Sequence, residues 1–447
     1  MDKKVIATCI DYTHDGKGVV KIDKMPIFVD NLLIGEEAEI LITKKNKSYY
    51  LGKVSKLLKV SLNRVKPICP NYKICGGCHI MHMTYDEQLR FKAARVREVI
   101  KRIGGVEVDT PLITGMENPY RYRNKVQVPI GETYDGHIVA GFYHPKSHQI
   151  IDMEECFIEN KDADNLVLTI KKLVKKYNIE PCDIYHNIGV LRYVIIRKSM
   201  DNNDILVVFV TRNNTFPKSS SFINELVSKC PNIKTVVQNV NPKNTSVVLG
   251  NYEKVLYGDG YIFDKINGLT FKISAHSFYQ VNPLQTEILY SKAIEFANLS
   301  KKETVLDAYC GVGTIGLIAS KKAKFVKGVE LVESAIKDAK ENAKANNISN
   351  ASFVCADATD FILEEAKRKK TYDVMFLDPP RDGCSDKFIK SVLKMEPKKI
   401  VYVSCDPSSL ARDLKQLKSK YILEKLECVD MFPQTYHVET ICLLVKK

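Results

Sequence analysis

Cys405 is the residue of this sequence best placed for covalent chemistry. It follows an apolar stretch, residues 400–404, that we predict to be a buried strand, and it begins the segment Cys405-Asp406-Pro407-Ser408. A cysteine within a sheet is most often a small core residue with no chemical role. At the end of a strand, however, its thiolate can attack an electrophilic carbon and activate a substrate by forming a covalent adduct.

Two carboxylates stand at comparable places in the sequence. Asp378 follows an apolar stretch and precedes two prolines, which fix the chain and remove backbone donors, so its carboxylate is presented rigidly. Many amino-group methyltransferases have an aromatic residue after such a proline pair, and the Arg381 found here argues against methylation of an exocyclic amine. Glu439 stands just before the last apolar stretch, where it is available as a general base.

A thiol and a base together suit methylation of carbon 5 of uracil. That carbon is not nucleophilic enough to attack a sulfonium methyl group until a thiolate has added to carbon 6. The proton on carbon 5 must then be removed so that the thiol can be eliminated. Our hypothesis is therefore that Cys405 is the nucleophile and Glu439 the base.

A glycine-rich turn at the end of an earlier apolar stretch predicts a cofactor site. The turn is Asp307-Ala308-Tyr309-Cys310-Gly311-Val312-Gly313. Its glycines allow a tight turn and close approach of a ligand, although the same pattern also fits dinucleotide binding. Glu330 and Asp357 end or follow the next two apolar stretches, where one could accept ribose hydroxyls and the other an adenine amino group. The set favours S-adenosylmethionine over a nicotinamide cofactor.

A cysteine-rich turn predicts a metal site. Cys69, Cys75 and Cys78 have the spacing C-x5-C-x2-C, and Cys156 is our choice for a fourth ligand. Four thiolates can hold zinc or an iron–sulfur cluster. Zinc sites more often use two C-x2-C pairs, so the single pair here favours a 4Fe–4S cluster, and a chance surface grouping stays a third reading.

The elements that must position these residues are predicted from periodicity. Beyond residue 277, apolar strands alternate with helical stretches, which is typical of a doubly wound, mostly parallel α/β sheet that binds ligands at the carboxyl ends of its strands. The predicted strands are 304–307, 325–330, 351–355, 374–377, 400–404 and 440–445. Residues 118–268 read as a mixed α/β region, in which the strip from Tyr120 to Lys125 interleaves aromatic and basic side chains and is a candidate RNA contact.

Short apolar alternations separated by turns predict a small β-barrel in residues 1–58. Lysines and tyrosines between its last two strands could meet phosphates and bases, or could form an ordinary solvated hairpin. These are Lys44, Lys45, Lys47, Tyr49 and Tyr50. In residues 85–103, apolar side chains recur at helical spacing with Arg and Lys between them. This pattern predicts a basic amphipathic helix, which we expect to pack on the C-terminal domain. We therefore divide the chain into domains 1–58, 59–268 and 269–447.

The charge of the chain favours a polyanionic partner. Its 447 residues include 67 Lys and Arg against 53 Asp and Glu, a formal net charge of +14. Residues 1–105 hold 20 Lys and Arg against 11 Asp and Glu, so +9 of that excess lies at the N-terminal end, which favours RNA. With no signal-like or membrane-spanning apolar run and 13 scattered cysteines, we expect a cytoplasmic protein with reduced thiols and no obligate protein partner.

Taken together, these residues resemble the TRAM-domain RNA uridine-5-methyltransferase family, which includes the bacterial 23S rRNA (uracil-5-)-methyltransferases. The resemblance spans essentially the whole chain, and the family signature appears as Ser277-Phe278-Tyr279-Gln280-Val281-Asn282. It implies an N-terminal TRAM barrel and a 4Fe–4S cluster on Cys69, Cys75, Cys78 and Cys156. It also implies cofactor contacts at Gln280, Tyr309, Glu330 and Asp378, with a second, catalytic role for Asp378 in hydrogen bonding to the uracil ring. It assigns Cys405 as nucleophile and Glu439 as base.

The resemblance leaves the RNA open. A TRAM domain together with four cluster cysteines favours 23S rRNA, because dedicated bacterial tRNA enzymes of this family generally lack both. The alternatives are methylation of a T-loop uridine of tRNA, and an RNA-binding or RNA-folding protein whose methylation activity is secondary. A radical methylthiotransferase is disfavoured, because those enzymes use a C-x3-C-x2-C triplet and the first gap here is five residues.

Overall fold

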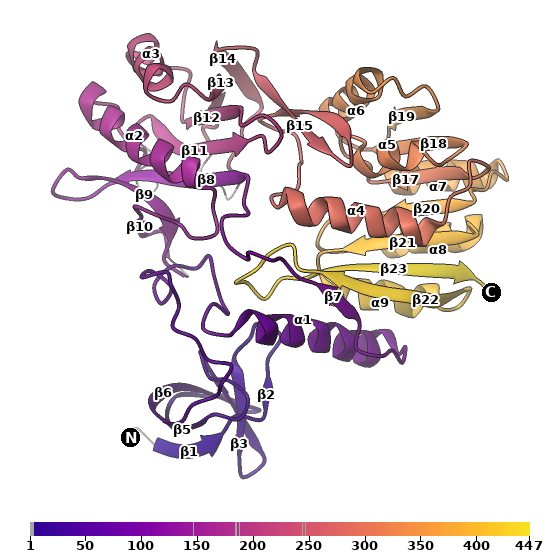
Figure 1. The fold of residues 1–447 in the computed structure, drawn as a ribbon, viewed down its shortest axis with the longest axis horizontal. Helices are drawn as coiled ribbons and strands as arrows, with labels where there is room; N and C mark the ends of the chain where they lie inside the picture. Colours follow the sequence, from indigo (N-terminus) through magenta and orange to yellow (C-terminus); the bar gives the residue numbers. More distant parts are fainter. Residues whose placement is uncertain (1–3, 146, 184–185, 187, 244, 246) are drawn as a thin grey trace.

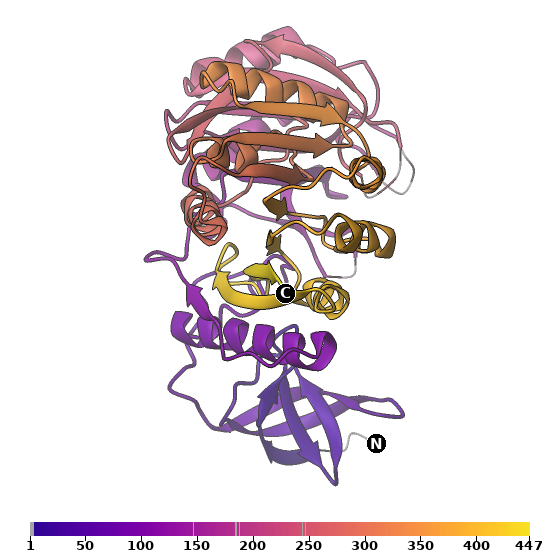
Figure 2. The same cartoon turned by 90° about the vertical axis from the view of Figure 1, so that its right-hand side faces the viewer.

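The computed structural model describes residues 4–145, 147–183, 186, 188–243, 245 and 247–447. The chain forms a small N-terminal sheet, a central sheet and a large C-terminal sheet, with helix α1 lying between the N-terminal and C-terminal sheets (Figure 1). The view turned by 90° shows the same arrangement (Figure 2). No helix of the described residues is both long and apolar enough to cross a membrane.

The N-terminal sheet has six short strands in the order β1-β5-β6-β4-β3-β2. They are β1 (Lys4–Thr8), β2 (Asp11–Tyr12), β3 (Gly18–Ile22), β4 (Met25–Val29), β5 (Glu37–Lys45) and β6 (Tyr50–Lys59). The sheet curls so that β1 also contacts β3, and it encloses a small apolar core around Val20, Ile27 and Ile40. All pairs are antiparallel except β4 with β6.

Helix α1 (Tyr85–Val99) follows the cysteine-rich segment and continues into a π-helical turn, η1 (Ile100–Gly104). Thr84 caps α1 by accepting a hydrogen bond from the backbone N–H of Glu87. The π turn lies against helix α9 (Pro407–Leu417), and a Cβ on Gly104 would lie 3.2 Å from the carbonyl oxygen of Ala411. A glycine here therefore lets the two backbones approach closely.

The central sheet has seven strands in the order β10-β9-β8-β11-β12-β13-β14, with helices α2 (Lys161–Tyr177) and α3 (Ser219–Lys229). The strands are β8 (Lys125–Glu132), β9 (Ile138–Tyr143), β10 (Ile150–Asp152), β11 (Leu191–Lys198), β12 (Ile205–Thr211), β13 (Ile233–Val240) and β14 (Tyr252–Tyr257). Seven buried residues in a row make β12 apolar on both faces, as expected for a central strand covered on both sides.

The C-terminal sheet has eight strands in the order β19-β18-β17-β20-β21-β23-β22-β7. Its strands are β17 (Thr304–Ala308), β18 (Phe325–Glu330), β19 (Ala351–Cys355), β20 (Val374–Leu377), β21 (Lys399–Ser404), β22 (Tyr421–Val429) and β23 (Glu439–Lys446), with β7 (Leu112–Thr114) at the edge. Strands β17 to β21 are parallel, and β23 is antiparallel to β21. The prediction of a doubly wound α/β sheet is confirmed, whereas β22 and the added edge strand β7 were not predicted.

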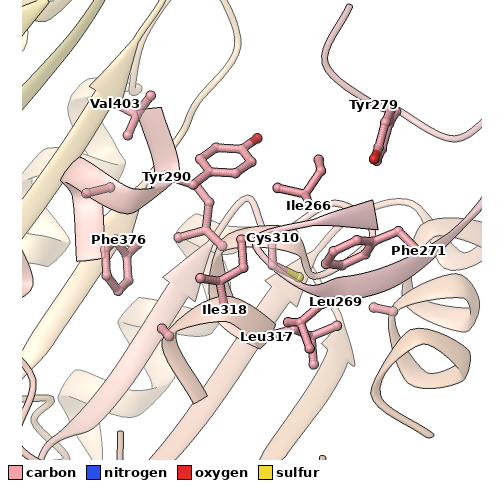
Figure 3. Close-up of a cluster of buried hydrophobic side chains, with 14 of the residues drawn as sticks. Ile266, Leu269, Phe271, Tyr279, Tyr290, Cys310, Leu317, Ile318, Phe376 and Val403 are labelled. Atoms are coloured by element: carbon pink, nitrogen blue, oxygen red, sulfur yellow. The ribbon is translucent and has the colours of Figure 1, made fainter. Parts of the chain in front are cut away.

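Helices α4 (Pro283–Ala297), α5 (Thr314–Ser320), α6 (Glu333–Ala345), α7 (Ala358–Lys367), α8 (Asp386–Met395) and α9 accompany this sheet. A hairpin of β15 (Tyr261–Ile266) and β16 (Leu269–Ser274) joins the central and C-terminal parts, and its side chains share one apolar cluster with α4 and the C-terminal sheet (Figure 3). The boundary predicted at 268/269 falls at the turn of this hairpin, whose strands pair along their whole length.

Candidate active site and cysteine cavity

The glycine turn lies between β17 and α5, at the carboxyl end of an interior strand of the sheet. Gly311 and Gly313 have φ of +53° and +84°, a region that glycine adopts without a steric cost. Asp307 is buried and accepts a hydrogen bond from the backbone N–H of Gly316 at 2.8 Å. Burial raises the pKa of Asp307 to about 8. This carboxyl therefore braces the turn from inside.

Glu330 ends β18 and faces the same turn. One of its carboxylate oxygens accepts the backbone N–H of Gly311 at 3.2 Å, and the other accepts that of Val332 at 2.9 Å. Asp357 follows β19 and caps helix α7 by accepting the backbone N–H groups of Thr359 and Asp360. Both predicted cofactor carboxylates thus lie at the carboxyl ends of adjacent strands, and Asp357 also has a capping role that the sequence analysis did not assign to it.

Tyr309 belongs to the glycine turn itself, and Gln280 comes from the segment between β16 and α4. The ring of Tyr309 packs against that of Phe388 with centroids 5.3 Å apart, and Tyr309 itself has a φ of +67°. Gln280 is buried beside the hydroxyl of Tyr290, with which it forms a hydrogen bond. Burial, together with the nearby carboxyls of Asp378 and Glu439, raises the pKa of Tyr290.

Sequence reasoning missed Tyr290. It lies on the buried face of α4, and Figure 3 shows its ring among apolar side chains with the hydroxyl at its outer end. A tyrosine on an apolar helix face is itself a signal, because a buried hydroxyl needs a hydrogen-bonding partner.

The register of the sheet brings Cys405 and Glu439 together. In the antiparallel pair of β21 and β23, Ser404 lies opposite Thr440. Cys405 directly follows β21 and Glu439 begins β23, so both lie at the same end of this pair. The hydroxyl of Thr440 also donates a hydrogen bond to the carbonyl of Ser404 at 3.0 Å, which fixes this end of the pair.

Asp378 reaches the same place from the neighbouring strand. Leu377 pairs with Tyr402 in the parallel pair of β20 and β21, so Asp378 leaves β20 beside the end of β21. Asp378 is half-buried, and burial of its carboxyl raises its pKa to about 7. The predicted catalytic residues Asp378, Cys405 and Glu439 are therefore close enough to affect one another's charge.

Burial raises the pKa values of both Glu439 and Cys405. It raises the pKa of Glu439 to about 8, with a further increase from Asp378 and an opposing effect of Arg381. The pKa of the Cys405 thiol is raised to about 11 by burial and then by the carboxyls of Glu439 and Asp378, while Arg381 lowers it. A thiol facing two carboxyls that titrate near neutral pH has proton acceptors at hand, which is what a nucleophile with an adjacent base requires.

The four predicted metal ligands line one cavity of about 190 Å³. Cys69, Cys75, Cys78 and Cys156 contribute to its wall, and Cys156 comes from a turn far along the chain. Burial, followed by the nearby Cys75 and Cys69, raises the pKa of Cys78 to about 12. Within the described part of the chain, no group of three or more Cys, His, Asp or Glu is close enough together to hold a single metal ion.

The strip from Tyr120 to Lys125 points largely into the protein. Arg121 donates to the carbonyl of Cys156 at 2.5 Å and to the carboxylate of Asp164 at 2.6 Å. Tyr122 is buried and donates to the carbonyl of Pro433 at 3.0 Å. Arg121 thus holds the segment that carries Cys156, and Tyr122 contacts the C-terminal part, which corrects the prediction of an RNA-contact strip for these two residues.

Comparison with known proteins places this geometry in context. A family model described as tRNA (Uracil-5-)-methyltransferase matches residues 248–447. A protein of Bacillus cereus (strain ATCC 10987 / NRS 248) named as an RNA methyltransferase is 47% identical over 437 residues, which cover 97% of this chain and 95% of that protein. A protein of Clostridium tetani (strain Massachusetts / E88) with the same description is 45% identical over 430 residues, covering 96% and 93%.

One solved structure matches the whole chain. It is the tRNA (uracil-54, C5)-methyltransferase of Pyrococcus abyssi in complex with S-adenosyl-L-homocysteine, and it is 28% identical with a TM-score of 0.78. The match covers 99% of this chain and 100% of that one. The similarity therefore includes the N-terminal sheet and the cysteine-rich segment as well as the C-terminal domain.

Proposed function

This chain belongs to the RNA (uracil-5-)-methyltransferase family, and from that premise we propose that it methylates carbon 5 of a specific uridine in RNA with S-adenosylmethionine as methyl donor. The observation that supports the proposal is the pairing of β21 with β23, which brings Cys405 and Glu439 to the same end of the two strands, near enough to Asp378 for their charges to interact. A thiol near a base, next to a cofactor turn, is what this reaction needs.

The residues around the glycine turn fit S-adenosylmethionine. Glu330 lies where a ribose can be held, Asp357 lies at the next strand end, and Gly311 leaves open space that no side chain within 4 Å fills. Gln280, Tyr309 and Asp378 line the approach to Cys405 in this proposal. The bound cofactor supplies an electrophilic methyl group, and the chain supplies the rest of the chemistry.

The chain's own residues carry two half-reactions. In the first, the proton of Cys405 passes to a neighbouring carboxylate and the sulfur forms a bond to carbon 6 of uracil, which makes carbon 5 nucleophilic enough to take the methyl group. In the second, Glu439 removes the proton from carbon 5, the bond between sulfur and carbon 6 breaks, and the thiolate is released. Asp378, held rigid by the prolines that follow it, orients the uracil ring.

We propose a 4Fe–4S cluster for the cysteine cavity. The donor set is four thiols, and the cavity between them suits a group of several atoms better than one ion, because a single ion would need the sulfurs to converge directly. Purification without oxygen should give about four irons per chain, and Cys78→Ser should lower both iron content and melting temperature. Stoichiometric zinc, or unchanged melting of the Cys78→Ser protein, would contradict this.

For the RNA, we propose 23S rRNA, with the curled N-terminal sheet as a TRAM barrel that binds it. The combination of that barrel with four cluster cysteines supports rRNA. The alternative is a tRNA T-loop uridine, and it is favoured by the name of the Pyrococcus abyssi enzyme that matches the whole chain. A cytoplasmic location goes with either substrate. An RNA-folding role with secondary methylation is the third candidate.

The mechanism is tested with substitutions that separate the two half-reactions. Cys405→Ala should reduce methylation to background and form no covalent complex, while cofactor binding persists. Glu439→Gln should accumulate a covalent adduct with RNA already methylated at carbon 5. Mapping 5-methyluridine in rRNA and tRNA from cells with and without the protein identifies the substrate. A Cys405→Ala protein that still made 5-methyluridine would show that the nucleophile is another residue.

A further inference from the structure

The loop that delivers Glu439 has no regular structure of its own. It spans residues 430–438, between β22 and β23, and Glu439 is the first residue of β23. Gln434 near its middle is 2% exposed and has a φ of +69°, a conformation that a residue other than glycine holds only when its surroundings impose it. The polar groups of such a buried loop must find partners elsewhere in the chain.

The first partner is Gln88 on α1. Its side-chain oxygen accepts the backbone N–H of Gln434 at 3.0 Å, and its amide nitrogen donates to the side-chain oxygen of Gln434, also at 3.0 Å. Both residues are almost fully buried. The paired hydrogen bonds fix the loop in position and in rotation at its midpoint.

The second partner is a buried ion pair one helical turn further along α1. The ammonium of Lys92 lies 2.6 Å from a carboxylate oxygen of Asp430, and both side chains have no exposed surface. Lys92 also donates to the carbonyl of Phe432 at 3.1 Å. The other carboxylate oxygen of Asp430 accepts the hydroxyl of Tyr85 at 2.9 Å, so this end of the loop is held from two positions of the helix.

The far end of the loop is held by Arg95. One guanidinium nitrogen donates to the carbonyl of Tyr436 at 2.8 Å, three residues before Glu439, and the guanidinium lies 5.8 Å from the centroid of the Tyr436 ring. Tyr85, Gln88, Lys92 and Arg95 are spaced by three, four and three residues and therefore share one face of the helix. The side chains on that face contact a loop that lies more than 330 residues away in the sequence.

The backbone after Cys78 completes this arrangement. The N–H groups of His79 and Ile80 both donate to the carbonyl of Gln434, at 2.9 and 3.2 Å. The midpoint of the loop is thus held from α1 by side chains and from the cysteine-rich segment by the main chain. Two N-terminal segments converge on one residue of the loop that leads to Glu439.

We propose that this face of α1 positions Glu439 for the second half-reaction, with Gln88 and Tyr85 as positioning residues. The inference rests on the proposed role of Glu439 as base. Removal of the carbon-5 proton requires the carboxylate at a defined place, whereas addition of Cys405 depends on β21 and α9. Loosening the loop should therefore slow elimination more than addition or methyl transfer.

The test compares Gln88→Leu and the milder Tyr85→Phe with two references. Glu439→Gln shows the full elimination defect, and Gln416→Leu is a matched substitution on α9 that removes only a surface hydrogen bond to Asp386. We expect turnover of Gln88→Leu to fall roughly tenfold, since small misplacements of a catalytic group have effects of this order. The covalent adduct with methylated RNA should accumulate in Gln88→Leu and less in Tyr85→Phe, but not in Gln416→Leu.

Amide hydrogen exchange of residues 430–438 gives a readout that does not depend on the chemistry. Exchange should be faster in Gln88→Leu and Tyr85→Phe than in Gln416→Leu. If Glu439→Gln accumulates the adduct and the two α1 variants lose turnover without it, the positioning role is wrong. If Glu439→Gln forms no adduct, Glu439 is not the base and the proposed function is wrong at this residue. Unchanged hydrogen exchange of residues 430–438 in the two α1 variants would overturn the positioning role whether or not Glu439 is the base.

Discussion

At the scale of single residues, the site is governed by burial of acidic groups. Glu439 lies in the protein interior beside Asp378, and both carboxyls hold their protons to higher pH than they would in water. Cys405 lies just before the N-terminus of α9, whose dipole favours a thiolate, whereas burial and the two carboxyls raise the pKa of its thiol to about 11. In the proposed mechanism the thiol must therefore pass its proton to a neighbouring group when the sulfur attacks.

The raised pKa of Glu439 predicts that the free energy of unfolding depends on pH. Its pKa is raised from an ordinary value near 4.5 to about 8, so the folded protein binds more protons than the unfolded chain between these values. Stability should therefore fall as pH rises from about 5 to about 8. Glu439→Gln has no carboxyl to ionise at this position, so this loss of stability disappears. The variant should be more stable than the unmodified protein at pH 8 by roughly 2–4 kcal/mol.

Thermal unfolding of both proteins at pH 5 and pH 8 measures the effect. The melting temperatures should lie close together at pH 5 and separate at pH 8, with Glu439→Gln higher. A difference that is the same at both pH values would mean that the carboxyl of Glu439 ionises in the folded protein as it does in water.

At the scale of elements, helix α1 is an N-terminal element that is structurally part of the C-terminal domain. It packs on α9 and the loop 430–438, and the strand β7 that follows it extends the C-terminal sheet by pairing with β22. The most buried of these contacts is the ion pair of Lys92 and Asp430. Breaking a buried pair leaves an uncompensated charge and is costly, whereas replacing both partners removes that penalty.

Lys92→Met should lower the free energy of unfolding by about 3–5 kcal/mol, because Asp430 would be left buried without its cation. Lys92→Met combined with Asp430→Asn should recover part of the loss. Chemical denaturation of the two variants and the unmodified protein provides the comparison. Lys171→Met, which removes the cation of a pair with the more exposed Asp152, is a control that should cost about 1 kcal/mol or less. Equal losses in the single and double variants would mean that packing of the lysine chain, and not its charge, is what matters.

At the scale of the whole molecule, a group of exposed cations lies on the N-terminal sheet. Lys44, Lys45 and Lys47 are exposed at the tip of the β5–β6 hairpin, at the opposite end of the molecule from α6 (Figure 1). Among the described residues, no ion pair involves these three lysines. The ammonium of Lys45 lies over the ring of Tyr50, 5.8 Å from its centroid. Cations without an acidic partner on this hairpin can neutralise phosphates of a large RNA.

Replacing these three lysines with alanine should weaken RNA binding and reduce the slope of log Kd against log salt concentration by about 2, since each phosphate contact contributes about 0.7 for a single strand. Lys337, Lys340 and Lys344, exposed on α6, provide a matched triple substitution whose slope should stay unchanged. Filter-binding titrations at several salt concentrations provide the measurement. A loss of slope shared equally by both triple variants would indicate a general charge effect in place of a hairpin contact.

The sequence by itself determined the features that depend on neighbouring residues. Asp307, Glu330 and Asp378 each lie at or next to the last residue of a short apolar strand, and both the strand and its functional end can be recognised locally. The topology of a parallel sheet then requires those ends to share one edge. For this reason the doubly wound sheet, the glycine turn and the candidate residues Cys405 and Glu439 could all be named without coordinates.

Only the tertiary structure decided what depends on contacts between distant segments. Lys92 reads as one more cation on a basic helix, and its burial against Asp430 follows from how α1 docks. Arg121 reads as an RNA contact, and it instead donates into the turn that carries Cys156. The pairing of β7 with β22 and the place of Tyr290 are of the same kind. The pattern of side chains along an element indicates which of its faces is buried. The partner of a buried charge or hydroxyl is fixed only when the elements pack, because the free energy of burying that group depends on residues hundreds of positions away in the sequence.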